Sequence, residues 1–126
     1  MRRFYVLLTL VLCSVFVSSQ EYTRKDTLRG KLTPIRTCYD VTFYDLNLFV
    51  DEQERSIERS TNIIHFTALE NFTWFQIDLA SNMEVMIVEF EGNKLEFNLE
   101  FDAVYIYFNR KIKKGEQLSI KVWYGG

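Results

Sequence analysis

Apolar and polar residues alternate in short runs over most of this 126-residue chain, and turn-forming residues separate the runs. A period of two is typical of β-strands, because successive side chains point to opposite faces of a sheet. No segment sustains the spacing of an amphipathic helix. The pattern predicts strands at 39–50, 56–68, 72–79, 83–90, 95–101, 103–108 and 118–124. About seven short strands predict an all-β fold, either an antiparallel sandwich or a curved, saddle-like sheet.

Some runs predict more local detail. A charged loop joins the first two runs, which predicts a hairpin, and a change of side-chain parity near Phe43 predicts a β-bulge. The runs 72–79 and 83–90 are apolar on both faces, as in central or doubly covered strands. Gly92-Asn93 predicts a two-residue turn of type II′. The strict alternation that follows at 95–101 predicts one buried face and one wet face.

The first 19 residues have the pattern of a secretory signal peptide. Arg2 and Arg3 precede a run from Phe4 to Val17 that is almost wholly apolar, and small residues follow it. The run is shorter than the roughly 20 residues that span a bilayer as a helix, so a retained anchor is the weaker interpretation. We expect cleavage after Ser19 and export to the periplasm or the medium, with no stable membrane span afterwards. Residues 20–38 then form a polar lead, and 39–126 form the β domain.

Composition excludes some classes of protein and partner. Apolar residues make up 48% of the chain, which is enough for a packed core. The formal charge of −2 does not supply the clustered Lys and Arg of a nucleic-acid binder, so no nucleic-acid partner is expected. Cys38 is the only cysteine after the signal, so no internal disulfide is expected. It is either a reactive nucleophile or a buried apolar residue, and the absence of a basic neighbour favours burial.

Few residues offer catalytic or metal-binding chemistry. His65 is the only histidine and has no partner at metal-ligand spacing, so we expect no zinc site. Acidic pairs and a basic turn at 110–115 are typical of a solvated surface. The pairs are Glu52 with Glu54 and Glu89 with Glu91, and the turn carries Lys111, Lys113 and Lys114. The sequence therefore predicts no catalytic, cofactor-binding or metal-binding residue.

Aromatic residues at 72–75 and 105–107 leave two interpretations open. Phe72, Trp74 and Phe75, or Tyr105 and Tyr107, form either a platform for stacking sugars or peptides or part of the core, and packing is favoured. Asn71 begins the N-glycosylation pattern Asn-Phe-Thr, which recurs often by chance.

An ordered set of short segments resembles the start of the N-terminal β domain of M1-family zinc aminopeptidases. The segments are 39–48, 56–64, 75–79, 91–97, 103–108, 113–116 and 120–126, and the lead 22–30 resembles that of exported members from Bacteroidetes-type bacteria. Two local departures stand out. Family members often have glycine where Arg59 stands, and usually Asn-Gly where this chain has Gly92-Asn93.

The resemblance implies a non-catalytic part of a secreted zinc aminopeptidase. In that family an H-E-x-x-H helix and a distant Glu bind zinc in a later catalytic domain, and peptide substrates are cleaved there. No such motif occurs in this sequence, so it is expected to be a fragment without a cofactor of its own, truncated before that domain. The alternative is an independent secreted β-sandwich that binds peptide, glycan or a partner protein. Truncation after the run 118–124 predicts an exposed strand edge there and self-association through it.

Overall fold

The computed structural model describes residues 22–126, and the expected signal segment lies outside them. Two short helices, α2 (Arg24–Gly30) and α3 (Pro34–Thr37), precede the strands. The strands are β1 (Tyr39–Asn47), β2 (Val50–Asp51), β3 (Ser56–Ile57), β4 (Ser60–Ala68), β5 (Phe72–Asp78), β6 (Glu84–Phe90), β7 (Asn93–Lys94), β8 (Glu96–Glu100), β9 (Ala103–Ile112) and β10 (Gln117–Gly125). No helix among residues 22–126 is long and apolar enough to cross a membrane.

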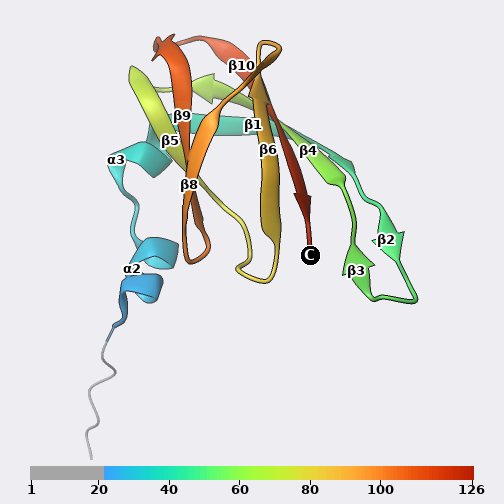
Figure 1. Ribbon diagram of the computed structural model, residues 1–126. Helices are drawn as coiled ribbons and strands as arrows, with labels where there is room; N and C mark the ends of the chain where they lie inside the picture. The colour runs from blue at the N-terminus through green and yellow to red at the C-terminus, as the bar shows by residue number, and fades with distance from the viewer. Residues whose placement is uncertain (1–21) are drawn as a thin grey trace, which may run out of the picture.

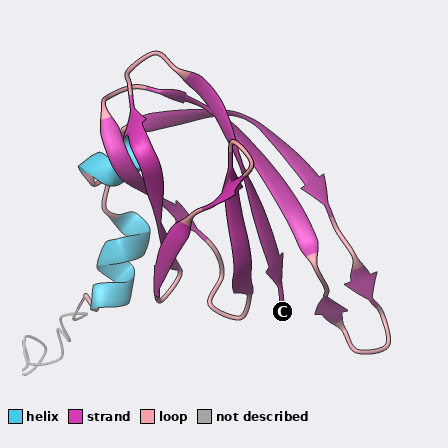
Figure 2. Cartoon of the chain, turned by 45° about the horizontal axis from the view of Figure 1, so that its top comes forward, coloured by secondary structure: helices cyan, strands magenta, loops and turns pink. Residues whose placement is uncertain are grey.

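The strands form two facing antiparallel sheets and a small ribbon, which confirms the predicted all-β class. One sheet has the order β1-β4-β10-β6-β7, and the other has the order β5-β9-β8. The strands β2 and β3 pair with each other and extend the β1–β4 hairpin beyond the smaller sheet (Figure 1). The smaller sheet therefore covers only one end of the larger one, and the larger sheet curves past it (Figure 2).

The core lies between the two sheets and follows the predicted alternation. Phe66 of β4 packs against Phe75 of β5, with ring centroids 5.4 Å apart, and against Phe108 of β9 at 6.4 Å. Ile106 and Ile120 are almost completely buried beside them. Burial of each such side chain contributes about 1.5–3 kcal/mol, so these facing strands hold the two sheets together.

The polar lead 20–38 is partly helical, which the sequence interpretation missed. Thr23 and Asp26 form a capping box at the start of α2, and Pro34 stands at the start of α3. These are ordinary signals for the start of a helix. Neither helix contains a buried residue, and for this reason no apolar stripe marked them in the sequence.

The first hairpin forms as predicted, but its second strand is interrupted. The β1–β4 register shifts between Val41 and Phe43, which confirms the bulge. The predicted run 56–68 is divided into β3 and β4, because Arg59 adopts a positive φ of 43°.

The predicted turn at Gly92-Asn93 is wrong by one residue and in type. Phe90 pairs with Asn93, so the loop consists of Glu91 and Gly92, with φ values of 49° and 78°. Positive φ at both central residues fits a type I′ turn, in which the first position favours Asn and the second favours Gly. Compared with the Asn-Gly turn usual in the resembled family, this turn therefore differs only at its first position, where Glu91 replaces Asn.

Four further expectations are wrong in the structure. The strand β10 is the centre of the larger sheet and pairs with both β4 and β6, so the edge expected at 118–124 is not exposed. The strand β5 is an edge strand, although its run is apolar on both faces. The run 95–101 is buried only at its start, because Leu99 and Phe101 are more than half exposed. The predicted basic turn at 110–115 begins within β9, which continues to Ile112.

Replacement of Arg59 by glycine should stabilise the fold. A non-glycine residue at φ 43° is strained, and glycine adopts this conformation without a steric cost. We expect Arg59→Gly to raise the free energy of unfolding by roughly 0.5–1 kcal/mol, measured by denaturant titration. The neighbouring Glu58→Gly is the control and should lower it. An Arg59→Gly variant that is less stable than the parent would contradict this account of the strand break.

Candidate functional site

An apolar hollow lies on the part of the larger sheet that the smaller sheet leaves uncovered. This concave apolar groove has a volume of about 540 Å³. Its apolar lining comes from Tyr39, Val41, Tyr44, Leu46, Leu48, Ile57, Ile64, Ile77, Leu79, Met83, Val85, Val122 and Tyr124. Its polar lining is confined to Arg36, Asn62 and Asp78. Such a surface binds apolar groups and offers no nucleophile.

Tyr39 belongs to the lining of the groove. Its hydroxyl donates a hydrogen bond to the backbone carbonyl of Gln76 at 2.7 Å, and its ring packs edge-on against Phe75. Burial raises the pKa of Tyr39 far above its usual value, so the phenol stays protonated. Its role is to link β1 to the smaller sheet.

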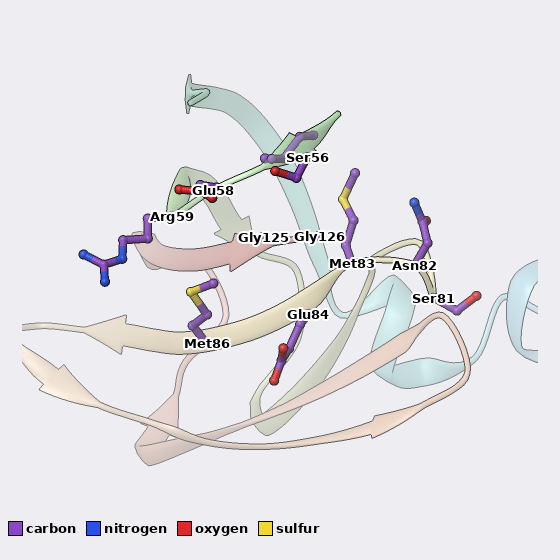
Figure 3. A pocket seen from close by; sticks show the side chains of 11 residues that line it. Ser56, Glu58, Arg59, Ser81, Asn82, Met83, Glu84, Met86, Gly125 and Gly126 are labelled. Carbon is purple, nitrogen blue, oxygen red and sulfur yellow. The ribbon is translucent and has the colours of Figure 1, made fainter. Parts of the chain in front are cut away.

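A second, more polar depression lies beside the groove (Figure 3). It is formed where the ends of β3, β6 and β10 meet the loop 81–83. Gly126 exchanges two backbone hydrogen bonds with Ile57, at 2.7 and 2.8 Å. A side chain at Gly125 would collide with the Ile57 carbonyl, so this close approach requires glycine. The site brings together backbone atoms and separate charged side chains, and no catalytic arrangement is formed.

The outer face of the smaller sheet carries an aromatic patch, which we define as Trp74, Tyr105 and Tyr107. The rings of Trp74 and Tyr107 are nearly parallel, with centroids 5.9 Å apart, and both are more than a third exposed. The amide of Asn98 donates to the Tyr107 hydroxyl at 3.3 Å. The aromatic residues for which the sequence left core packing or stacking open thus fall into two groups. Phe72 and Phe75 are core residues, whereas the patch faces solvent.

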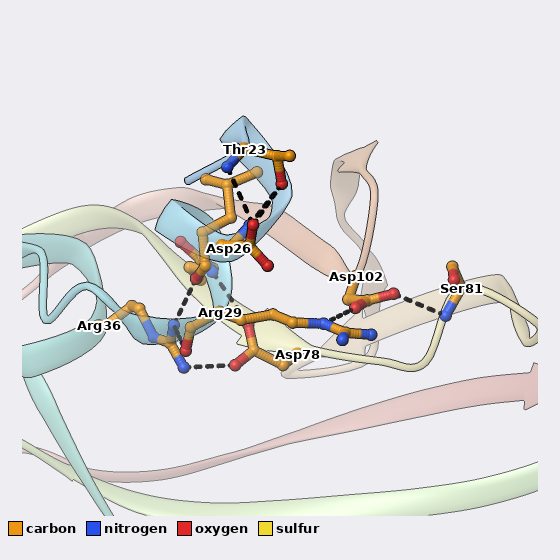
Figure 4. Close-up of polar contacts among 9 residues, drawn as sticks. Thr23, Asp26, Arg29, Arg36, Asp78, Ser81 and Asp102 are labelled. Carbon is orange, nitrogen blue, oxygen red and sulfur yellow. Dashed lines mark hydrogen bonds and ion pairs between the residues drawn. The ribbon is translucent and has the colours of Figure 1, made fainter. Parts of the chain in front are cut away.

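Three arginines of the helical lead bind acids at one end of the smaller sheet, and Figure 4 shows the pairs made by Arg29 and Arg36. Arg29 pairs with Asp102, Arg36 pairs with Asp78, and Arg24 pairs with Glu100 at 2.9 Å. These three ion pairs, which we call the arginine strap, join residues up to 76 positions apart. No short sequence motif could have revealed them.

Asp102 is the central acid of the strap. It is buried, and its second oxygen accepts from the backbone N–H of Ser81 at 2.9 Å. The hydrogen bond from Arg29 holds the pKa of Asp102 below its usual value despite burial, and the bond from Arg24 does the same for Glu100. Both acids are therefore ionised near neutral pH and act as anchors, not as proton donors.

Cys38 and His65 are the residues for which the sequence raised, and disfavoured, a nucleophile and a metal ligand. Cys38 is 5% exposed, and burial raises the pKa of its thiol to about 11, which confirms a buried apolar residue. The ring of His65 lies 5.7 Å from that of Phe43 on the larger sheet. No group of three His, Cys, Asp or Glu residues within 22–126 is placed to hold a metal ion.

The charged residues singled out from the sequence lie at exposed or half-buried positions. Glu91 pairs with Arg110 at 2.7 Å, and Glu89 accepts from the indole of Trp123 at 3.4 Å. Exposed positions are also occupied by Glu52, Glu54, Lys111, Lys113, Lys114 and Asn71. The side chain of Asn71 accepts from the backbone N–H of Lys114, which orders this turn.

The arginine strap should loosen in acid before the β core unfolds. A lowered pKa in the folded state means that the stabilisation from Asp102 is complete above the usual carboxyl pKa and is lost as the pH falls through the lowered value. We expect amides of α2 to exchange several-fold faster in Asp102→Asn at neutral pH, measured by hydrogen exchange, and to lose most of the acid dependence.

Glu96→Gln is the matched control, because Glu96 is exposed on the same sheet and makes no ion pair within 22–126. Equal exchange in both variants would show that the ion pairs do not hold α2.

Comparison with solved structures identifies the fold. An M1 zinc metallopeptidase from Deinococcus radiodurans is similar over 72% of this chain and 21% of its own, with a TM-score of 0.64 and 21% identity. Native yeast LTA4 hydrolase is similar over 86% of this chain and 17% of its own, with a TM-score of 0.60 and 18% identity. The chain thus spans about a fifth of the length of these proteins.

No family model and no curated protein sequence matches this chain. The structural likeness covers 72–86% of this chain, although identity is low. It confirms the fold expected from the resemblance: this chain has the fold of the N-terminal β domain of M1 zinc metallopeptidases.

Proposed function

We propose that this chain is a non-catalytic N-terminal β-domain part of an exported M1-type zinc metallopeptidase that removes N-terminal residues from peptides. One observation carries the proposal: the fold likeness covers 72–86% of this chain but about a fifth of the similar proteins. Activity and peptide substrates would then belong to the larger protein. The signal-like segment 1–19 supports the expectation of export.

The chemistry of residues 22–126 fits a supporting role. A catalytic zinc ion needs three protein ligands and an open position. The thiol of Cys38 is buried and protonated, and His65 has no ligand partner in the described region. These residues do not fit zinc, so zinc and hydrolysis are assigned to another part of the proposed enzyme.

The concave apolar groove supports the same assignment. Groups such as Leu46 and Leu48 are more than half exposed along its rim, and large apolar surfaces usually mark contact sites. In the proposed enzyme the groove is a contact surface for other parts of the protein and helps to shape the substrate cleft.

Isolation of the native protein from the secreted fraction of its source tests the proposal. We expect peptides from 22–126 to occur in a polypeptide several times longer, with one zinc per chain and hydrolysis of amino-acid anilides. Its N-terminus should be Gln20. The purified 20–126 chain is the control and should neither bind zinc nor hydrolyse the substrate, because it lacks a ligand set. A native product that ends near Gly126 and carries no zinc would refute the assignment.

The aromatic patch favours a second candidate function, an independent secreted binding module. Exposed parallel rings such as Trp74 and Tyr107 offer a flat stacking surface, and Asn98 adds a polar group at its border. A sugar ring or an extended peptide fits such a surface.

Titration with soluble oligosaccharides and with peptides, followed by tryptophan fluorescence, tests this candidate. Binding should fall at least tenfold in Trp74→Ala and Tyr107→Ala, because each removes a stacking ring. Trp123→Ala is the matched control, since Trp123 lies on the other sheet against Lys121. Unchanged binding in the patch variants, or no binding by the parent chain, would exclude the patch as the site.

A further inference from the structure

Asp102 joins the arginine strap to the segment 79–83, which we call the wall loop. One carboxylate oxygen accepts from the guanidinium of Arg29, and the other accepts from the backbone N–H of Ser81 at 2.9 Å (Figure 4). The backbone carbonyl of Asp102 also accepts from the N–H of Leu79 at 2.8 Å. One buried residue therefore holds both α2 and the wall loop.

The wall loop lines both hollows of the molecule. Leu79 and Met83 line the concave apolar groove, and Ser81, Asn82 and Met83 line the polar depression (Figure 3). The loop also lies close against the end of β10, where a side chain on Gly126 would collide with the Asn82 carbonyl. A movement of the wall loop would therefore change the shape of both hollows at once.

The wall loop has few other attachments. Within residues 22–126, its one other backbone hydrogen bond runs from Met83 to the Ala80 carbonyl at 2.8 Å, and this bond lies inside the loop. Ala80, Ser81 and Asn82 are exposed. Segments with few buried contacts open at a low free-energy cost. The two hydrogen bonds to Asp102 are thus the polar link between the wall loop and the smaller sheet.

The two partners of the ion pair differ in exposure, so α2 is the part that can detach. The Arg29 side chain is 57% exposed and α2 contains no buried residue, whereas the Asp102 side chain is 8% exposed. Loss of Arg29 leaves a buried carboxylate without an ion pair, which then turns toward water or takes up a proton. Either response weakens its hydrogen bond to Ser81, because bonds to a well-placed charged acceptor are the stronger ones.

We propose that α2 is a latch for the wall loop: bound through Asp102 it fixes the loop, and its detachment releases the loop and reshapes both hollows. Coupling of this kind is reciprocal, so release of the wall loop must also loosen α2. The ion pair of Arg24 with Glu100 belongs to the strap but not to the latch, because Glu100 makes no hydrogen bond to the wall loop within 22–126. The inference is independent of the proposed enzyme, since it concerns neither zinc nor hydrolysis.

Hydrogen exchange of the exported chain tests the latch from the side of α2. We expect the hydrogen-bonded amides of the wall loop to exchange at least about fivefold faster in Arg29→Ala, the lower end of typical coupling between two sites. Arg24→Ala is the matched control, because it removes an arginine of the same helix without touching Asp102, and it should leave the wall loop unchanged. Circular dichroism should show the same fold in both variants. An unchanged wall loop in Arg29→Ala, or an equal change in Arg24→Ala, would overturn the proposal.

Substitutions at Ser81 test the reverse direction of the coupling. Ser81 is the second residue of the turn from Ala80 to Met83 and has no positive φ, so proline fits there and removes only the N–H that Asp102 accepts. Ser81→Pro should make the amides of α2 exchange at least about fivefold faster, although Ser81 makes no hydrogen bond to α2 within 22–126. Ser81→Ala keeps the N–H and should behave like the parent chain. The latch is refuted if α2 exchanges at the same rate in the proline and alanine variants.

Discussion

The contact of Phe66 with the aromatic residues of the smaller sheet determines the arrangement of this protein. Phe66 of β4 meets Phe72 and Phe75 of β5 and Phe108 of β9, and these rings tie two sheets that share no backbone hydrogen bonds between their strands. Because the smaller sheet has three strands, this core ends before the larger sheet does. The uncovered part of the larger sheet becomes the concave apolar groove, and the β1 edge continues it. The groove and the β1 edge are therefore exposed because the core between the two sheets does not extend over the whole larger sheet.

The period-two pattern predicted the class of the fold because the alternation of residues within each strand shows which side chains share its buried face. Val104, Ile106 and Phe108 were placed on one face from their spacing, and all three are buried. The bulge near Phe43 was predicted for the same reason, since an extra residue changes parity in the sequence itself. The buried state of Cys38 followed from its apolar context. Local patterns of this kind depend on neighbouring residues, so sequence alone is sufficient for them.

Strand order and the arginine strap could not be predicted from local sequence patterns, because both depend on residues far apart in the sequence. A run such as 72–79 has apolar residues at both parities whether its strand is central or, as here, at an edge with Trp74 exposed, so the sequence pattern does not distinguish the two positions. The ion pair of Arg24 with Glu100 joins residues far apart in the sequence, and a single charge carries no information about its partner. The exposure of Trp74 follows from the register shift between Phe72 and Trp74, which places the two aromatic residues on different faces. The candidate patch therefore required the folded register.

The concave apolar groove and the β1 edge share side chains, because both lie on the part of the larger sheet that the smaller sheet leaves uncovered. A partner that pairs with β1 must also meet Tyr44 and Leu46, because both side chains lie on the strand that it extends. Backbone pairing provides orientation, whereas the apolar side chains supply most of the driving force. Among the described residues, β1 thus combines a sheet margin with exposed apolar side chains, and a helix could not pair with that margin because it presents no free backbone groups along its sides.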